Sequence, residues 1–123
     1  MQKKLIVVGG GAAGMMAALF AARAGARVLL LERNEKLGKK VYITGKGRCN
    51  VTNAAPPEEL LRGYARNGRF LHSAFANLTN EDLMRRIEGA GVPLKVERGG
   101  RVFPVSDKAS DITRALERMM REG

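Results

Sequence analysis

The 123-residue sequence predicts an α/β fold centred on a β-strand, an α-helix and a second, parallel strand. Leu5 to Val8 is an uninterrupted apolar run, which is typical of a strand buried on both faces of a parallel sheet. A glycine cluster and an alanine-rich stretch follow, and a second apolar run extends from Arg27 to Leu31. This order of a short strand, a glycine turn, a helix and a second strand indicates a βαβ unit. Helices and a small β-hairpin are predicted to follow it.

The glycines between the first strand and the helix have the G-x-G-x-x-G spacing. Gly9 permits a tight turn, Gly11 lets the backbone approach a pyrophosphate, and Gly14 lets the helix pack closely on the sheet. Ala12 and Ala13 keep the start of the helix small, and its N-terminal N–H groups face the phosphates. The pattern predicts a Rossmann-like, dinucleotide-binding turn.

Glu32 ends the second strand, eighteen positions after Gly14, where a carboxylate accepts hydrogen bonds from an adenosine ribose. A close-packed βαβ corner without a ligand is the alternative interpretation of the glycines. A Walker A phosphate loop is excluded, because Met15 and Met16 stand where that loop needs Lys and Ser or Thr.

Composition restricts the other classes of protein. No run of eighteen apolar residues is present, so we expect no membrane span and no membrane partner. The first strand begins almost at once, without the apolar segment of an export signal. Cys49 is the single cysteine, which excludes an internal disulfide and fits a cytoplasmic location.

Half of the net charge of +10 lies in one region. Residues 33–50 contain six basic residues and one acidic residue, a net charge of +5. Aromatic residues for base stacking are not interleaved with this loop, so its position favours an anionic cofactor over nucleic acid. A solvated basic face remains the alternative for Lys36, Lys39 and Lys40.

Residues 33–53 are expected to form a glycine-rich loop with a short strand at Val41–Ile43. Ala54–Glu59 is expected to be a connector. Helical spacing then extends from Leu71 to Leu78, and Thr79 is expected to cap a second helix whose apolar face includes Ile87.

The C-terminal third is expected to contain a hairpin and a helix. Pro93–Glu97 and Arg101–Phe103 are the predicted strands, joined at Gly99-Gly100. Ser106 or Asp107 is expected to cap the last helix, whose apolar face is Ile112, Ala115, Leu116 and Met119. His72 has no partner at ligand spacing, so no metal site is predicted.

Several of these segments resemble the N-terminal part of the aminoacetone oxidase-like flavoproteins, a family that includes the BaiN flavoproteins and is described as NAD(P)/FAD-dependent oxidoreductases. The resemblance rests on the glycine fingerprint, Glu32-Arg33, Gly38-Lys39-Lys40, the T-G-K-G-R-C-N run at Thr44–Asn50, and Gly100–Pro104. It covers essentially the whole chain. Family members are longer, so residues 1–123 are expected to be the N-terminal part of an FAD-binding Rossmann-like domain, without its later strands and the second domain.

The resemblance implies FAD as cofactor, NAD(P)H as a candidate electron donor, and a small-molecule substrate. The T-G-K-G-R-C-N loop is expected to run beside the flavin, where Lys46 or Arg48 could favour negative charge on the reduced ring. Cys49 is either a reactive thiol activated by these cations or a small residue packed in a tight loop. The implied cofactor site is Gly9, Gly11, Ala12, Ala13, Gly14, Glu32, Arg33, Lys40, Thr44, Gly45, Lys46, Gly47, Arg48, Cys49 and Asn50.

No residue is an evident acid, base or nucleophile, so no catalytic residue is assigned. The predicted function is the FAD-binding portion of a flavin-dependent oxidoreductase that transfers a hydride between FAD and a substrate or NAD(P)H. The remaining flavoprotein fold is expected to be needed for activity. A non-catalytic, truncated nucleotide-binding fragment is the main rival, and a basic nucleic-acid-binding protein is the less favoured one.

Overall fold

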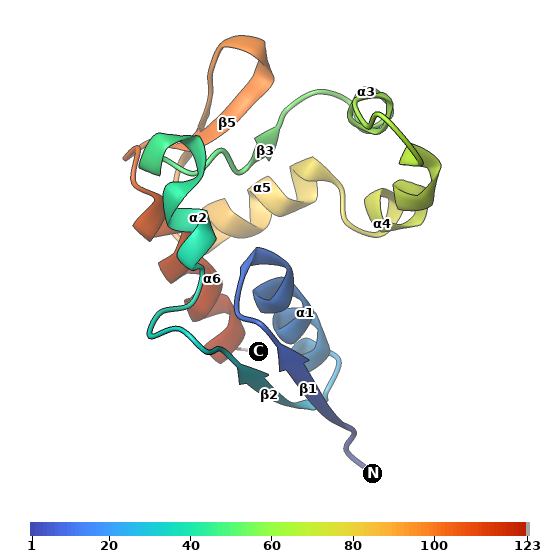
Figure 1. Ribbon diagram of the computed structural model, residues 1–123, viewed down its shortest axis with the longest axis vertical. Coiled ribbons are helices and arrows are strands. Elements are labelled where there is room, and N and C mark those ends of the chain that lie inside the picture. The colour runs from blue at the N-terminus through green and yellow to red at the C-terminus, as the bar shows by residue number, and fades with distance from the viewer. Residues whose placement is uncertain (123) are drawn as a thin grey trace.

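The computed structural model describes residues 1–122 and contains the predicted βαβ unit (Figure 1). Strand β1 (Lys4–Val8) leads through the glycine turn into helix α1 (Ala12–Arg23), which returns the chain to strand β2 (Arg27–Leu31). The two strands are parallel and pair in register, with Ile6 opposite Leu29. The predicted Rossmann-like α/β class is therefore confirmed.

The rest of the chain contains a second, antiparallel sheet, several short helices and the 14-residue helix α6 (Ala109–Glu122). This small sheet has the strand order β3-β5-β4, and β4 and β5 form the predicted hairpin. The remaining elements are, in chain order, α2 (Lys39–Ile43), η1 (Thr44–Gly47), β3 (Thr52–Asn53), α3 (Pro57–Arg62), η2 (Gly68–Leu71), α4 (His72–Asn77), α5 (Asn80–Gly89), β4 (Leu94–Val96), η3 (Arg98–Gly100), β5 (Arg101–Pro104) and α6 (Ala109–Glu122).

Two segments differ from the sequence prediction. The segment Val41–Ile43, expected to be a strand, belongs to helix α2, because Gly38 turns the chain in the left-handed region and the helix then buries Val41. The expected connector Ala54–Glu59 overlaps helix α3. Pro57 occupies the first helical position, and Glu58 and Glu59 lie in the first turn beside the positive end of the helix dipole.

The caps predicted for α5 and α6 differ in the contacts that their side chains make. Thr79 caps α5 with a complete capping box, because its hydroxyl accepts from the Asp82 N–H and the Asp82 carboxylate accepts from the Thr79 N–H. Ahead of α6, the Ser106 hydroxyl accepts from the Lys108 N–H, while the Asp107 carboxylate pairs with side chains of the small sheet. No helix within residues 1–122 is long and apolar enough to cross a membrane.

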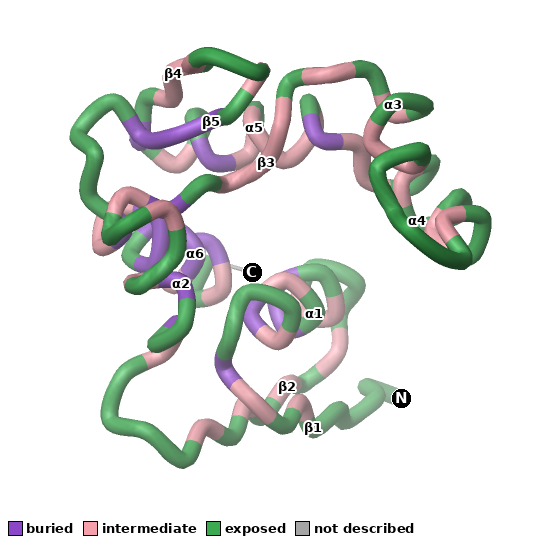
Figure 2. The backbone as a smooth tube through the Cα atoms, turned by 45° about the horizontal axis from the view of Figure 1, so that its top comes forward, coloured by how far each residue is buried: buried purple, intermediate pink, exposed green. Residues whose placement is uncertain are grey.

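The core lies between α1, α2 and α6 rather than around the parallel sheet (Figure 2). Helix α6 buries the predicted apolar face, and Met15 and Leu19 of α1 pack in the same cluster. Because α6 lies against both α1 and α2, it fixes the glycine turn relative to the loop that follows β2.

Strands β1 and β2 are not buried on both faces, although an apolar run such as Leu5 to Val8 is typical of strands that are. The inner face of β2 borders α1 and α6, where Val28 and Leu30 line a shared hollow. On the outer face Ile6, Val8, Leu29 and Leu31 are 62%, 83%, 55% and 47% exposed. No element of residues 1–122 covers that face, so the chain presents one bare apolar sheet surface.

Candidate functional site

The predicted glycine turn is a tight, hydrogen-bonded turn at the end of β1. Gly9 has φ +98°, a left-handed conformation that favours glycine, and its N–H donates to the Leu31 carbonyl at 2.8 Å. A Cβ on Gly14 would overlap the Gly9 carbonyl oxygen. These two glycines therefore close the turn and bring α1 against it.

The start of α1 fits a phosphate group. Gly11 precedes the helix in extended conformation, no side chain caps the helix, and no acidic residue lies in its first turn. A Cβ built on Gly11 meets no atom within 4 Å, so the space above the turn is open. Ala12 and Ala13 are exposed and small. The start of α1 is therefore suited to bind an anion, because it offers unpaired N–H groups, the positive end of the helix dipole and open space.

Glu32 is tied directly to the glycine turn. Its Oε1 atom accepts from the Gly10 N–H at 2.9 Å, and Oε2 accepts from the Asn34 N–H at 2.7 Å. The hydrogen bonds from the Asn34 and Gly10 amides lower the pKa of Glu32, so this carboxylate is ionised at neutral pH. Gly10 is buried, and the sequence interpretation did not include it among the site residues.

The T-G-K-G-R-C-N loop is a compact left-handed turn. Gly45, Lys46 and Gly47 have φ values of +55°, +57° and +85°, and Cys49 has +62°. Lys46 and Cys49 are not glycines, so their left-handed backbone is held by surrounding contacts. A Cβ on Gly45 would lie 2.8 Å from the Asn50 nitrogen, which leaves no room for a side chain.

Arg48 joins this loop to the small sheet. Its guanidinium donates to Glu97 at 2.9 Å and Asp107 at 3.1 Å, and it lies 3.8 Å from the centre of the Phe103 ring. Lys95 pairs with the same two carboxylates. The hydrogen bonds that Arg48 donates to Glu97 and Asp107 raise the pKa of Arg48, and the hydrogen bonds from Arg48 and Lys95 lower the pKa values of the two acids.

Cys49 is buried, with 6% of its surface exposed. Burial raises the pKa of its thiol, which disfavours the first of the two alternatives for Cys49, a reactive thiol activated by Lys46 and Arg48. Arg48 is held by Glu97 and Asp107, and the structure gives the position of a small packed residue rather than a reactive thiol.

The remaining residues of the predicted cofactor site are exposed cations or polar residues that stabilise the loop. Arg33, Lys40 and Lys46 are exposed cations, and the Thr44 hydroxyl donates to the Val41 carbonyl at 2.7 Å. The Asn50 side chain donates to the carbonyls of Thr52 and Val102, which holds the end of the loop on β5.

The structure brings together the glycines and Glu32, but it keeps the T-G-K-G-R-C-N loop separate from them. Within residues 1–122, no hydrogen bond or ion pair joins Thr44–Asn50 to Gly9–Gly14. The link runs through α2: the Gly38 N–H donates to the Gly10 carbonyl at 2.8 Å, and Val41 packs in the core cluster with Met15. Figure 1 shows α2 on the side toward which β1 and β2 point.

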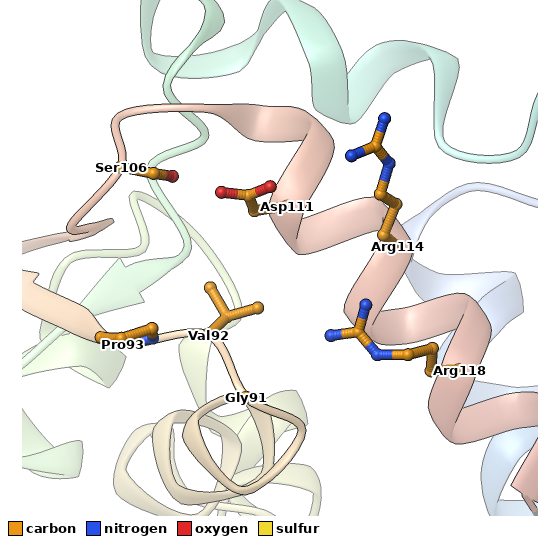
Figure 3. A pocket seen from close by; sticks show the side chains of 7 residues that line it. All are labelled: Gly91, Val92, Pro93, Ser106, Asp111, Arg114 and Arg118. Atoms are coloured by element: carbon orange, nitrogen blue, oxygen red, sulfur yellow. The ribbon is translucent and has the colours of Figure 1, made fainter.

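A second hollow of about 250 Å³ lies away from the glycine turn, between the end of α5 and α6 (Figure 3). Asp111, Arg114 and Arg118 of α6 line it together with Ser106 and the segment Gly91–Pro93. The Arg118 guanidinium donates to the Ala90 carbonyl at 2.7 Å, where it satisfies the C-terminal end of α5. This contact gives Arg118 a structural role.

A parallel βαβ unit with this glycine turn and an acid after its second strand defines a Rossmann-type nucleotide-binding domain. The chain matches the family described as HI0933-like protein Rossmann domain over residues 3–123, and it belongs to that family. This confirms the resemblance to the FAD-binding oxidoreductases that include the BaiN flavoproteins.

Three relatives carry functional names. The chain is 35% identical over 109 residues to a 3-dehydro-bile acid delta(4,6)-reductase of Clostridium scindens, covering 87% of this chain and 26% of the relative. It is 36% identical over 103 residues to a ribosomal RNA dihydrouridine synthase of Escherichia coli, and this match covers 83% of this chain and 25% of the relative. A synthase of the same name from Haemophilus influenzae is 32% identical over 83 residues, and the match covers 67% of this chain and 20% of the relative. The chain spans about a quarter or less of the length of these relatives.

Proposed function

We propose that this chain binds FAD and supplies the cofactor site of an oxidoreductase that reduces an unsaturated substrate, with NAD(P)H as electron donor. The observation that carries the proposal is the Gly10 N–H bonded to the Glu32 carboxylate, with the open start of α1 beside it. The two names that these three relatives carry both describe reductions, since dihydrouridine has two more hydrogens than uridine.

Bound FAD would supply the redox centre that accepts and donates a hydride. The chain's own residues position it: the first-turn N–H groups of α1 hold the pyrophosphate, and Glu32 accepts from the ribose hydroxyls. Arg48 is neutralised by Glu97 and Asp107, so its role is to build the loop. Lys46, exposed and in no ion pair within residues 1–122, is the better candidate to favour negative charge on the reduced flavin.

The relatives' names supply two substrate classes, a bile acid and ribosomal RNA. A base in RNA is the second candidate for this chain, in contrast to the sequence-based preference for a small molecule. The specific observation in its favour is an exposed segment, Arg62–Phe70, that combines arginines with aromatic side chains.

Titration of the apoprotein with FAD, followed by flavin fluorescence, tests the proposal. Glu32→Ala removes the ribose acceptor, so the dissociation constant for FAD should rise roughly tenfold to a hundredfold. Glu35→Ala is the matched control, because Glu35 is an exposed acid three residues away, and it should leave the constant unchanged. An unchanged constant in Glu32→Ala would refute the ribose assignment, and a chain that takes up no FAD would support the non-catalytic fragment.

A further inference from the structure

The segment Arg62–Phe70 reads RGYARNGRF and differs in composition from the basic loop after β2. It contains three arginines, two aromatic residues and no acid. Interleaved cations and aromatic rings are the combination that proteins use to bind single-stranded nucleic acid, since the cations contact phosphates and the rings stack on bases.

The structure exposes this segment at the side of the molecule. It joins the end of α3 to η2, and α3, η2 and α4 contact mainly one another, so the unit stands away from the core (Figures 1 and 2). Two local hydrogen bonds shape the turn, from the Tyr64 N–H to the Leu61 carbonyl and from the Phe70 N–H to the Asn67 carbonyl.

Both aromatic rings face solvent. Tyr64 is 49% exposed and Phe70 is 86% exposed, whereas Leu71, Phe75 and Leu78 of the neighbouring helical stretch are half-buried. Leu71, Phe75 and Leu78 are therefore the apolar side chains that stabilise this unit. Tyr64 and Phe70 are free to contact a ligand.

The arginines are exposed as well. Within residues 1–122, Arg62, Arg66 and Arg69 form no ion pair with a carboxylate, unlike Arg48 and Arg85. The segment thus has a charge of +3, and the nearest acids in the sequence, Glu58 and Glu59 of α3, form no ion pair with it. Two open surface hollows of about 580 and 570 Å³ meet at Gly68 and Arg69, and Phe70 lines the second.

We propose that Arg62–Phe70 binds a single strand of RNA, with Arg62, Arg66 and Arg69 on the phosphates and Tyr64 and Phe70 stacked on bases. This inference deepens the RNA candidate of the proposed function and rests on it for the choice of RNA over DNA. FAD binding is not required for it. An apolar protein partner would fit the two rings, but the three exposed guanidinium groups near them in the segment fit a polyanion better.

The test measures fluorescence anisotropy of a labelled, mixed-sequence single-stranded RNA of 12 nucleotides against the full 123-residue chain at several salt concentrations. Matched single-stranded DNA and an RNA duplex are measured beside it. The single RNA strand should bind at least tenfold more tightly than the duplex. Tyr64→Ala/Phe70→Ala should weaken RNA binding roughly tenfold per lost stack without changing the salt dependence.

Arg62→Gln/Arg66→Gln/Arg69→Gln should weaken binding and reduce the slope of log affinity against log salt by about two, because three phosphate contacts to a single strand are lost. Arg23→Gln/Arg27→Gln/Arg121→Gln removes the same charge from exposed sites elsewhere and should change the slope much less. Tyr64→Phe/Phe70→Tyr keeps both rings and should bind as the unmodified chain does, which separates stacking from folding.

Three outcomes would overturn the proposal: equal loss in the two arginine triple variants, no loss in Tyr64→Ala/Phe70→Ala, or equal affinity for duplex and single strand. Equal affinity for the DNA strand would overturn the assignment to RNA. FAD titration of the same preparations distinguishes this failure from failure of the cofactor site, because none of these substitutions touches the glycine turn.

Discussion

Gly11 and Gly14 are two members of one fingerprint, but they differ in what a side chain would meet. A Cβ at Gly14 would overlap the Gly9 carbonyl oxygen, whereas a Cβ at Gly11 would enter open space. The structure therefore separates a glycine needed for folding from a glycine whose missing side chain leaves room for a ligand.

Gly11→Val should leave the thermal midpoint nearly unchanged and weaken FAD binding sharply, because a branched side chain would fill the phosphate space. Gly14→Ala should instead lower the thermal midpoint. Circular dichroism melts and FAD titrations of both variants check this, and Gly89→Val is the control at an exposed, open position. A Gly11→Val chain that binds FAD normally would contradict the assignment.

The acids around Arg48 give the chain a defined response to low pH. The pKa values of Glu97 and Asp107 are lowered in the folded chain by hydrogen bonds from Arg48 and Lys95, so their stabilisation is complete above the unfolded pKa values. Those values are about 4. The stabilisation is then lost as pH falls through the lower folded values.

Glu97→Gln/Asp107→Asn should therefore lower the thermal midpoint at pH 7, and the difference from the unmodified chain should shrink as pH falls below about 4. Thermal melts across pH 2.5 to 7 measure this. Glu58→Gln/Glu59→Gln is the control, since these acids form no ion pair within residues 1–122. A difference that is constant across this pH range would exclude the proposed linkage.

The sequence at the start of α5 specifies a complete capping box. Thr79 and Asp82 satisfy each other's backbone N–H groups. Thr79→Ala should destabilise the chain by about 1 kcal/mol, the usual value of such a cap. Urea unfolding compares this variant with Thr79→Ser, which keeps the hydroxyl and should be close to the unmodified chain. Equal loss in both variants would mean that the cap contributes little.

The accuracy of the sequence interpretation depends on how local each signal is. The βαβ unit, the hairpin at Gly99-Gly100 and the Thr79 cap all depend on neighbours within one element, and all three are present. The strand expected at Val41–Ile43 failed because β-branched residues favour a strand only locally, and here burial of Val41 against the core favours a helix.

In the candidate site, too, local contacts could be predicted from the sequence and long-range contacts could not. Gly9, Gly14 and Glu32 could be found from spacing, because one turn brings them together. The partners of Arg48 could not, since Glu97 and Asp107 lie 49 and 59 residues along the chain. For Cys49 the sequence left a reactive thiol and a packed residue as alternatives, and burial, which raises the pKa of the thiol, favours the packed residue.

At the scale of the whole molecule, the bare outer face of β1 and β2 is the largest departure from a self-contained domain. Four large apolar side chains, Ile6, Val8, Leu29 and Leu31, line it, and both strands are edge strands of a two-stranded sheet. Natural proteins cover or pair such faces and edges. The 123-residue chain should therefore associate and hold FAD weakly.

Sedimentation velocity at increasing protein concentration should show this association, and Ile6→Lys/Leu29→Lys should reduce it. Steady-state oxidation of NADH or NADPH by the chain with added FAD should remain at the rate of free flavin. A longer chain that also carries the remaining segments of the family should exceed that rate. A monodisperse, active 123-residue chain would show that the bare face needs no cover.

The bare face and the charge of +10 act against each other in solution. Mutual repulsion between cationic molecules keeps their apolar faces apart at low ionic strength, and at 0.1 M salt this repulsion extends only about 10 Å. Concentrated salt would therefore favour self-association while it releases any bound polyanion. A purification that removes nucleic acid with concentrated salt would bring the bare faces together, and a low-salt purification would keep the molecules separate with nucleic acid still attached.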